Sequence, residues 1–199
     1  SPHLIMRTFI TLYLLVIASF ADDLNLKEVY QNPLSNGIGE EIAWVKWDDA
    51  IEKALDEDKP IFLLIHKMSC HACRVLKKTF SQSNARKAFK ALSQYFIMVN
   101  TADEDELYEE EYSPDGKYVP RVLFLDKNGD LLAQFKNKKG VYKNYAYYYS
   151  SPADILNSMK DVLKHYKVEV PELKRGDKLK KKTEEKKELK KDEKKEEKK

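Results

Sequence analysis

The chain has 199 residues, of which 36 are Lys or Arg and 33 are Asp or Glu, so its formal net charge is +3. The basic excess lies in residues 174–199, which hold 14 basic and 8 acidic side chains, and the rest of the chain is slightly acidic, at about −3. Because this segment interleaves its bases with acids and contains no aromatic residue, we expect it neither to bind nucleic acid nor to join a core.

The amino-terminal residues predict a secretory leader. Arg7 precedes an apolar run of 13 residues, 8–20, and Ala21 stands just before two aspartates. This arrangement is typical of a signal peptide cleaved after Ala21, so we assign 1–21 to a leader. A membrane-spanning helix needs about 20 apolar residues. We therefore expect no permanent membrane span.

One folded unit is expected between the leader and the tail. Residues 22–40 contain Pro33, Gly37 and Gly39, which predict an irregular lead-in. We assign residues 41–170 to a single domain, a length that suits one hydrophobic core. Residues 171–199 form a Lys/Glu-rich, low-complexity tail.

Hydrophobic spacing predicts alternating helices and strands in the first half of the domain. Amphipathic spacing indicates helices, and short unbroken apolar runs indicate strands buried on both faces. In chain order we expect a helix over 41–57, a strand over 61–65, a helix from Cys70 through Phe80, a helix over 85–92 and a strand over 95–100.

The second half of the domain is predicted to contain a hairpin and a final helix. Asn128 and Gly129 are the residues that a tight hairpin turn prefers. In chain order we expect a short acidic helix over 103–111, a turn at 113–116, strands over 119–126 and 131–135, an extended segment at 142–149 and a helix over 152–167.

The order of these elements predicts the fold class. Strands that alternate with helices imply parallel pairing, and the hairpin adds an antiparallel edge. We therefore expect an α/β fold with three layers, in which helices flank a central mixed sheet, arranged as in thioredoxin. Cys70 then falls between the first strand and the helix that follows it.

The only two cysteines, Cys70 and Cys73, are spaced for redox chemistry. A sulfur at the start of a helix lies among unpaired backbone N–H groups, which stabilise its thiolate. A second thiol three residues later lies one helical turn away, where it can resolve a mixed disulfide. We assign Cys70 as the nucleophile and Cys73 as the more buried resolving thiol.

Structural roles for the cysteine pair are weaker interpretations. A disulfide between Cys70 and Cys73 closes so short a loop that it would contribute only roughly 2 kcal/mol, against about 4.7 kcal/mol for a loop of about 100 residues. A zinc site normally has four ligands, and no second cysteine pair exists to complete one. We expect neither a metal nor another cofactor.

Basic residues near the pair are candidates for tuning its reactivity. An imidazolium at His71 would stabilise the Cys70 thiolate and favour the reduced dithiol, but His71 could equally be an exposed helix-start residue with little effect. Lys67 offers positive potential in the same way, with the alternative of a solvated lysine.

A cluster of tyrosines follows the predicted hairpin. Aromatic side chains suit binding surfaces, so the cluster could hold a protein client. Cross-strand packing explains it as well, and we favour packing. The tyrosines concerned are Tyr142, Tyr145, Tyr147, Tyr148 and Tyr149.

Three segments carry a resemblance to a known family: IHKMSCHAC at 65–73, FIMVN at 96–100 and SPDGKYVPRVLFLD at 113–126. Together they resemble the small endoplasmic-reticulum proteins that comprise thioredoxin domain-containing protein 12 and the anterior gradient proteins. The resemblance covers about residues 40–167. It implies a thioredoxin-like domain of the secretory pathway that acts on protein disulfides or on folding clients.

The resemblance also implies roles for individual residues. Pro120 corresponds to the cis proline that abuts the cysteines in thioredoxin-like folds, and Val119 to the residue whose backbone pairs with an extended substrate. The alternative for Pro120 is a strand edge. The redox-active branch of the family keeps both cysteines, as this chain does, and the anterior gradient branch has lost the second.

The chain departs from the family at several positions. Ser69 replaces a tryptophan, His71 replaces a glycine, and Leu64 stands where protein disulfide isomerases carry a buried acid, with His66 nearby. The chain ends without a KDEL-type retrieval signal, so we expect it either in the lumen of the endoplasmic reticulum or secreted.

These observations favour a protein thiol–disulfide oxidoreductase of the secretory pathway, with cysteine-containing proteins or peptides as its partners. The alternative is a non-catalytic client-binding module of the anterior gradient kind. A dimeric adhesion or signalling factor is a third possibility, and a dimer is compatible with each of them.

Overall fold

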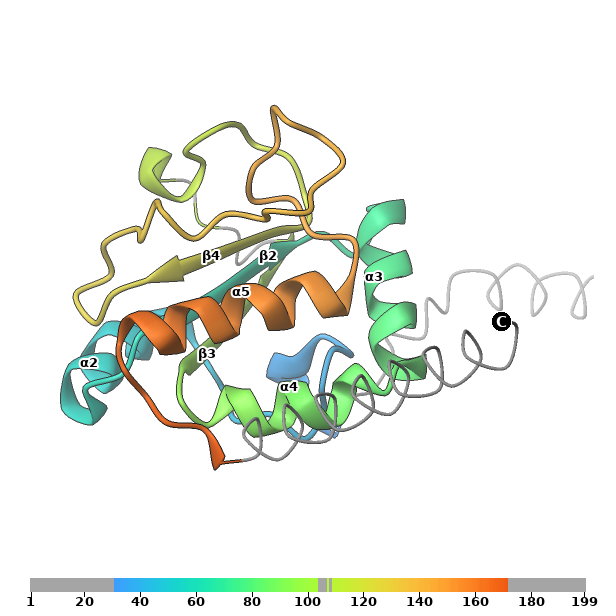
Figure 1. Cartoon of the computed structure of the whole chain (residues 1–199). Coiled ribbons are helices and arrows are strands. Elements are labelled where there is room, and N and C mark those ends of the chain that lie inside the picture. Colours follow the sequence, from blue (N-terminus) through green and yellow to red (C-terminus); the bar gives the residue numbers. More distant parts are fainter. Residues whose placement is uncertain (1–30, 104–106, 108, 172–199) are drawn as a thin grey trace, which may run out of the picture.

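The computed structural model describes residues 31–103, 107 and 109–171 (Figure 1). The predicted leader, the first part of the lead-in and almost all of the tail lie outside the described residues, as do residues 104–106 and 108 of the predicted acidic helix. No helix within the described part of the chain is long and apolar enough to cross a membrane.

A mixed sheet of four strands forms the centre of the described chain. Its spatial order is β1-β3-β2-β4; β1, β3 and β2 run parallel, and β4 runs antiparallel to β2. The strands are β1 (Trp44–Val45), β2 (Ile61–His66), β3 (Ile97–Ala102) and β4 (Arg121–Leu125). This confirms the expected mixed sheet with an antiparallel edge.

Helices cover both faces of the sheet (Figure 1). Because side chains alternate along a strand, Phe62, Leu64 and Phe124 point to one face and Ile61, Leu63 and Leu123 to the other. The first face packs against α3 (His71–Gln82), α4 (Ala85–Ser93) and α5 (Pro152–His165). The second packs against α2 (Trp47–Glu57) and the 3₁₀ turn η3 (Glu110–Tyr112).

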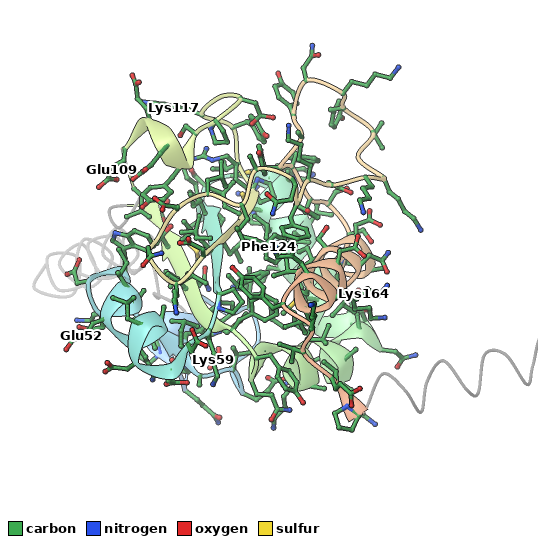
Figure 2. All side chains as sticks on the ribbon, turned by 60° about the vertical axis from the view of Figure 1, so that its left-hand side comes forward. Glu52, Lys59, Glu109, Lys117, Phe124 and Lys164 are labelled. Carbon is green, nitrogen blue, oxygen red and sulfur yellow. The ribbon has the colours of Figure 1, made fainter. Side chains whose placement is uncertain are left out.

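The interior on the α5 side is rich in aromatic rings. The centroid of the Phe124 ring lies 5.7 Å from that of Phe62 and 6.0 Å from that of Phe96. Figure 2 shows Phe124 among the side chains between β4 and α5. Trp44 packs against Phe62 and Phe89, and its indole N–H donates to backbone carbonyls of the lead-in, which contains the 3₁₀ turn η1 (Pro33–Ser35). The three expected layers are confirmed.

The predicted start of the first helix is wrong. The sequence pattern placed it at Glu41, but residues 44–45 form β1, and the helix begins at Trp47. Trp44 and Val45 are aromatic and β-branched residues that fit a strand, and they pair with Met98 and Val99 of β3. The spacing of apolar residues here fits both a helix and a strand, and pairing with the buried strand β3 selects the strand.

The predicted strand over 131–135 is also wrong. The turn at 128–129 forms, but only Leu131 bridges back to Leu125. Successive backbone bonds at Ala133 and Phe135 then curl the chain away from the sheet. This path carries the Phe135 ring to the α5 side, where it packs against Phe124 and His165. The predicted extended segment 142–149 is likewise reduced to a single bridge, between Tyr148 and Arg121.

Candidate functional site at the amino end of α3

Cys70 is the residue that caps α3. Its backbone is extended, with φ −73° and ψ 123°, and its Sγ accepts the N–H of Cys73 at 3.2 Å. A sulfur in this position takes the place of a side-chain oxygen in an ordinary helix cap. The N–H aimed at it, together with the positive end of the helix dipole, stabilises negative charge on the sulfur.

Cys73 lies one turn further along α3 and faces the interior. It is buried, with 3% of its surface exposed, whereas Cys70 is half-buried, and both are free thiols. Burial, and then the hydrogen bond with Cys70, raises the pKa of the Cys73 thiol above its ordinary value. The pair is therefore asymmetric, with one accessible sulfur and one sheltered thiol.

The start of β4 lies directly beside Cys70. The Val119–Pro120 peptide bond is cis, and the Cys70 thiol donates to the carbonyl oxygen of Val119 at 3.7 Å. Antiparallel pairing explains this meeting, because it sets Arg121 opposite Ile65, close to where the chain leaves β2 for α3. The structure thus brings together Cys70, Cys73, Val119 and Pro120, which the sequence had placed in one site.

The loop between β2 and α3 is held from two sides. The backbone N–H of Met68 donates to the carboxylate of Asp103, and Arg74 Nη1 donates to the carbonyl of Ser69 at 2.7 Å. The carbonyl of Lys67 accepts the N–H of Cys70. Lys67 itself is half-buried in this loop, close to the cysteines in sequence and in space.

The two histidines of the site differ in environment. His71 is exposed as the first residue of α3, whereas His66, the last residue of β2, is only 2% exposed. Burial lowers the pKa of His66, opposed by the amide of Asn100 and the charge of Asp103. Its Nε2 has no hydrogen-bond partner among the described residues. His66 is therefore a neutral interior group at physiological pH.

Arg121 is a residue of the site that the sequence analysis missed. It follows Pro120 and is fully buried, and its guanidinium donates to the carbonyls of Tyr112 and Tyr118. It also lies over the Tyr118 ring, 6.0 Å from the centroid. The available signal was a charged residue inside an otherwise apolar strand, because burying a charge costs free energy unless acceptors surround it.

The tyrosine cluster divides into two groups. Tyr147 and Tyr149 are buried, which agrees with packing, while Tyr142 and Tyr145 are exposed. Tyr148 is half-buried, between the two groups. Burial raises its pKa most, followed by negative charge on Tyr142 and on the two cysteine sulfurs, Cys70 and Cys73. Packing therefore accounts for only part of the cluster.

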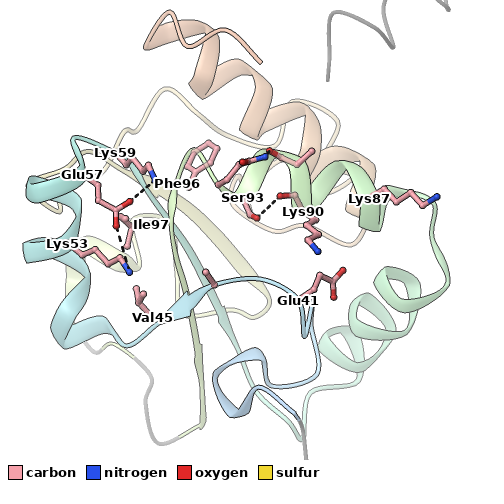
Figure 3. Close-up of a pocket in the computed structure, with 13 residues that line it drawn as sticks. Glu41, Val45, Lys53, Glu57, Lys59, Lys87, Lys90, Ser93, Phe96 and Ile97 are labelled. Carbon is pink, nitrogen blue, oxygen red and sulfur yellow. Dashed lines mark hydrogen bonds and ion pairs between the residues drawn. The ribbon is translucent and has the colours of Figure 1, made fainter. Parts of the chain in front are cut away.

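Neither a metal cluster nor the groove in Figure 3 belongs to this site. Among the described residues, no three His, Cys, Asp or Glu side chains lie close enough to hold a metal ion. A groove of about 550 Å³ opens at the other end of the sheet, where β3 begins. Lysines line much of it, and Lys53 and Lys59 pair with Glu57 there (Figure 3).

Comparisons with known proteins place the chain in a family. A protein-family model described as thioredoxin-like matches residues 43–127. Human anterior gradient protein 2 homolog is 33% identical over 141 residues, which cover 69% of this chain and 75% of the relative. Anterior gradient protein 3 of Xenopus tropicalis is 30% identical over 139 residues, covering 67% and 82%. The chain belongs to the anterior gradient family.

The thioredoxin-like fold of this anterior gradient family member is thereby confirmed. Two solved structures also match parts of the chain. The DsbH oxidoreductase is 21% identical and covers 46% of this chain and 69% of its own, with a TM-score of 0.34. A disulphide isomerase from Xylella fastidiosa Temecula1 is 20% identical and covers 54% and 77%, with a TM-score of 0.33.

Proposed function

We propose that this protein is a thiol–disulfide oxidoreductase that acts on cysteines of polypeptides in the secretory pathway. The observation that carries the proposal is the capped sulfur: Cys70 Sγ accepts the N–H of Cys73 at 3.2 Å while remaining half-exposed. The leader predicted at 1–21 supports the compartment, and we assign the exchange to the domain predicted at 41–170.

The exchange takes place in two steps. The Cys70 thiolate attacks one sulfur of a substrate disulfide, so a Cys70–substrate bond forms and the other substrate sulfur leaves as a thiolate. The Cys73 thiol then gives its proton to water and attacks Cys70 Sγ, which releases the second substrate thiol. The substrate disulfide is now reduced, and Cys70 and Cys73 are joined. A low-molecular-weight thiol restores the dithiol, and the same steps in reverse oxidise a substrate.

Val119 and Pro120 provide the place for the substrate backbone. The Val119 carbonyl lies 3.7 Å from Cys70 Sγ, and Val119 is half-buried, so an extended chain that pairs with Val119 is held next to the sulfur. Such pairing orients the substrate before reaction, which lowers the entropic cost of the attack. In this proposal His71 and Lys67 add positive charge near the Cys70 thiolate. His66 contributes a neutral, buried side chain next to the loop that carries Cys70.

Single cysteine variants test the proposal. In Cys73→Ser, attack by Cys70 proceeds but resolution does not, so a mixed disulfide with a peptide substrate should accumulate and appear by mass spectrometry. In Cys70→Ser, neither the adduct nor turnover of insulin disulfides should be seen. If Cys73→Ser gives no adduct while the wild type turns over no disulfide, the oxidoreductase proposal is wrong.

One observation favours the alternative of a non-catalytic client-binding module. Burial raises the pKa of Cys73, and Leu64, 1% exposed, supplies no carboxylate to take its proton. Resolution would then be slow, and the protein would hold clients rather than exchange their disulfides. This alternative predicts client binding that is unchanged in Cys70→Ser/Cys73→Ser, with negligible turnover by the wild type.

A further inference from the structure

Two exposed and two half-buried tyrosines form one continuous cluster beside the cis Val119–Pro120 bond. The rings of Tyr118 and Tyr145 lie 4.6 Å apart, those of Tyr142 and Tyr145 5.9 Å apart, and those of Tyr142 and Tyr148 5.5 Å apart. Tyr142 and Tyr145 keep 53% and 44% of their surface exposed. We call Tyr118, Tyr142, Tyr145 and Tyr148 the tyrosine platform.

Partly buried hydrogen bonds fix the platform in place. Tyr118 Oη donates to Asp115 at 2.6 Å and accepts the N–H of Tyr147 at 3.0 Å, and Asp115 also accepts the N–H of Ala146. These bonds join the loop before Pro120 to the loop that carries the exposed rings. The platform is therefore preorganised, so a partner would not have to order it on binding.

The platform adjoins the cysteines. Tyr118 directly precedes Val119, whose carbonyl accepts from Cys70, and Tyr148 bridges to Arg121 just after Pro120. In Figure 1 the loop that carries Tyr142 and Tyr145 rises beside the amino end of α3. A chain paired with Val119 would therefore extend across these rings.

The same loop is strongly basic. Residues 131–153 contain no Asp or Glu, and four exposed lysines lie close to Tyr142 in the sequence: Lys136, Lys138, Lys139 and Lys143. Lys138 pairs with Asp161 at 2.7 Å. Within the described part of the chain, Lys139 and Lys143 make no ion pair. Exposed rings with uncompensated lysines complement a partner that carries acidic side chains beside apolar ones.

We propose that the tyrosine platform and the lysines at 139 and 143 form a docking surface for acidic segments of extended polypeptides, and that it selects the substrates presented to Cys70. This rests on the proposed exchange function for its role, but binding by the surface can be measured without any exchange. The rings cover the apolar side chains of the segment, and the lysines attract its carboxylates.

Fluorescence anisotropy of labelled peptides tests the surface. The protein is the full chain with Cys70→Ser/Cys73→Ser, so that no covalent bond contributes. The probe peptide carries Glu and Tyr on both sides of a serine that replaces its cysteine. A second peptide has Lys in place of each Glu. We expect the acidic peptide to bind roughly tenfold more tightly than the basic one, by an amount that shrinks as salt is added.

Variants locate the binding. Lys139→Glu/Lys143→Glu should weaken the acidic peptide by roughly tenfold, and Tyr142→Ala/Tyr145→Ala should weaken both peptides. The matched control, Lys87→Glu/Lys90→Glu, makes the same charge change on exposed lysines of α4 at the distant groove and should leave both affinities unchanged.

Three outcomes overturn the proposal. The first is equal affinity for the two peptides. The second is a control variant that loses binding to the same extent as Lys139→Glu/Lys143→Glu. The third is a surface occupied by a second copy of this chain, seen as a dimer that the Lys139→Glu/Lys143→Glu change dissociates. Turnover of a small disulfide by the wild type tests the exchange function separately. A protein inert in that assay that still prefers the acidic peptide would refute the exchange and leave the docking surface standing.

Discussion

Replacing Arg121 by methionine should destabilise the protein and misplace Val119. The guanidinium is fully buried and donates to the carbonyls of Tyr112 and Tyr118. Methionine has a similar length and no donor, so both carbonyls lose this partner.

Two effects of opposite sign set the magnitude. A buried carbonyl without a donor costs about 1–3 kcal/mol, which applies in full to Tyr112, whereas the half-buried Tyr118 can recruit water and costs less. Removing the buried charge relieves part of its desolvation cost. We expect the free energy of unfolding to fall by about 2 kcal/mol, which lowers the urea midpoint by about 1 M.

Urea titration followed by tryptophan fluorescence measures the loss, since Trp44 is buried in the core. Arg121→Lys keeps the charge and can reach one carbonyl, so its midpoint should lie between those of the wild type and Arg121→Met. In the absence of urea, kcat/KM for a peptide disulfide should fall by roughly tenfold in Arg121→Met, because Val119 no longer holds the substrate in register. An Arg121→Met protein as stable and as active as the wild type would refute the positioning role.

Three further predictions concern buried polar groups. Because burial raises the pKa of Cys73, release of a fluorescent thiol from a mixed disulfide on Cys70 should accelerate about tenfold per pH unit between about pH 6 and pH 9, and a flat profile would contradict this. Burial lowers the pKa of His66, so the unfolded chain binds its proton more readily; stability should fall as pH drops below about 6.5, and His66→Gln should reduce that slope in urea titrations at each pH. Tyr149→Phe removes the 2.7 Å hydrogen bond to Ser158 and should lower the free energy of unfolding by about 1 kcal/mol. The double variant Tyr149→Phe/Ser158→Ala should recover part of that free energy, because Ser158 no longer leaves a hydroxyl without its partner. If the single and the double variant were equally stable, that would count against the bond.

The strands and helices around the cysteines follow from the sequence because several local signals agree there. The run at 61–65 is apolar throughout and pairs on both sides, and Cys70 begins a helix whose Cys73, Leu76 and Phe80 all face inward. Residues 41–46 and 131–135 were misassigned because their local patterns fit more than one structure. Contacts distant in sequence decided both, Met98 for Trp44 and His165 for Phe135.

The candidate site was predictable to the extent that chain order fixes it. The spacing of Cys70 and Cys73 and the resemblance around Pro120 placed the residues that the structure brings together. Arg121 and the hydrogen bonds of Asp115 depend on how two loops meet after folding, so no local pattern reveals them. The division of the tyrosines into buried and exposed members has the same origin, since their segment forms no strand and has no period of two.

The sulfur that closes the first turn of α3 is also the one expected to change its bonding. When Cys70 is joined to another sulfur it accepts a hydrogen bond less well, so the amide of Cys73 should exchange with deuterium faster than in the dithiol. Helix α3 would then report the oxidation state of its own first residues. Serine at position 70 preserves an acceptor there and alanine does not, so a serine variant separates lost chemistry from a frayed helix.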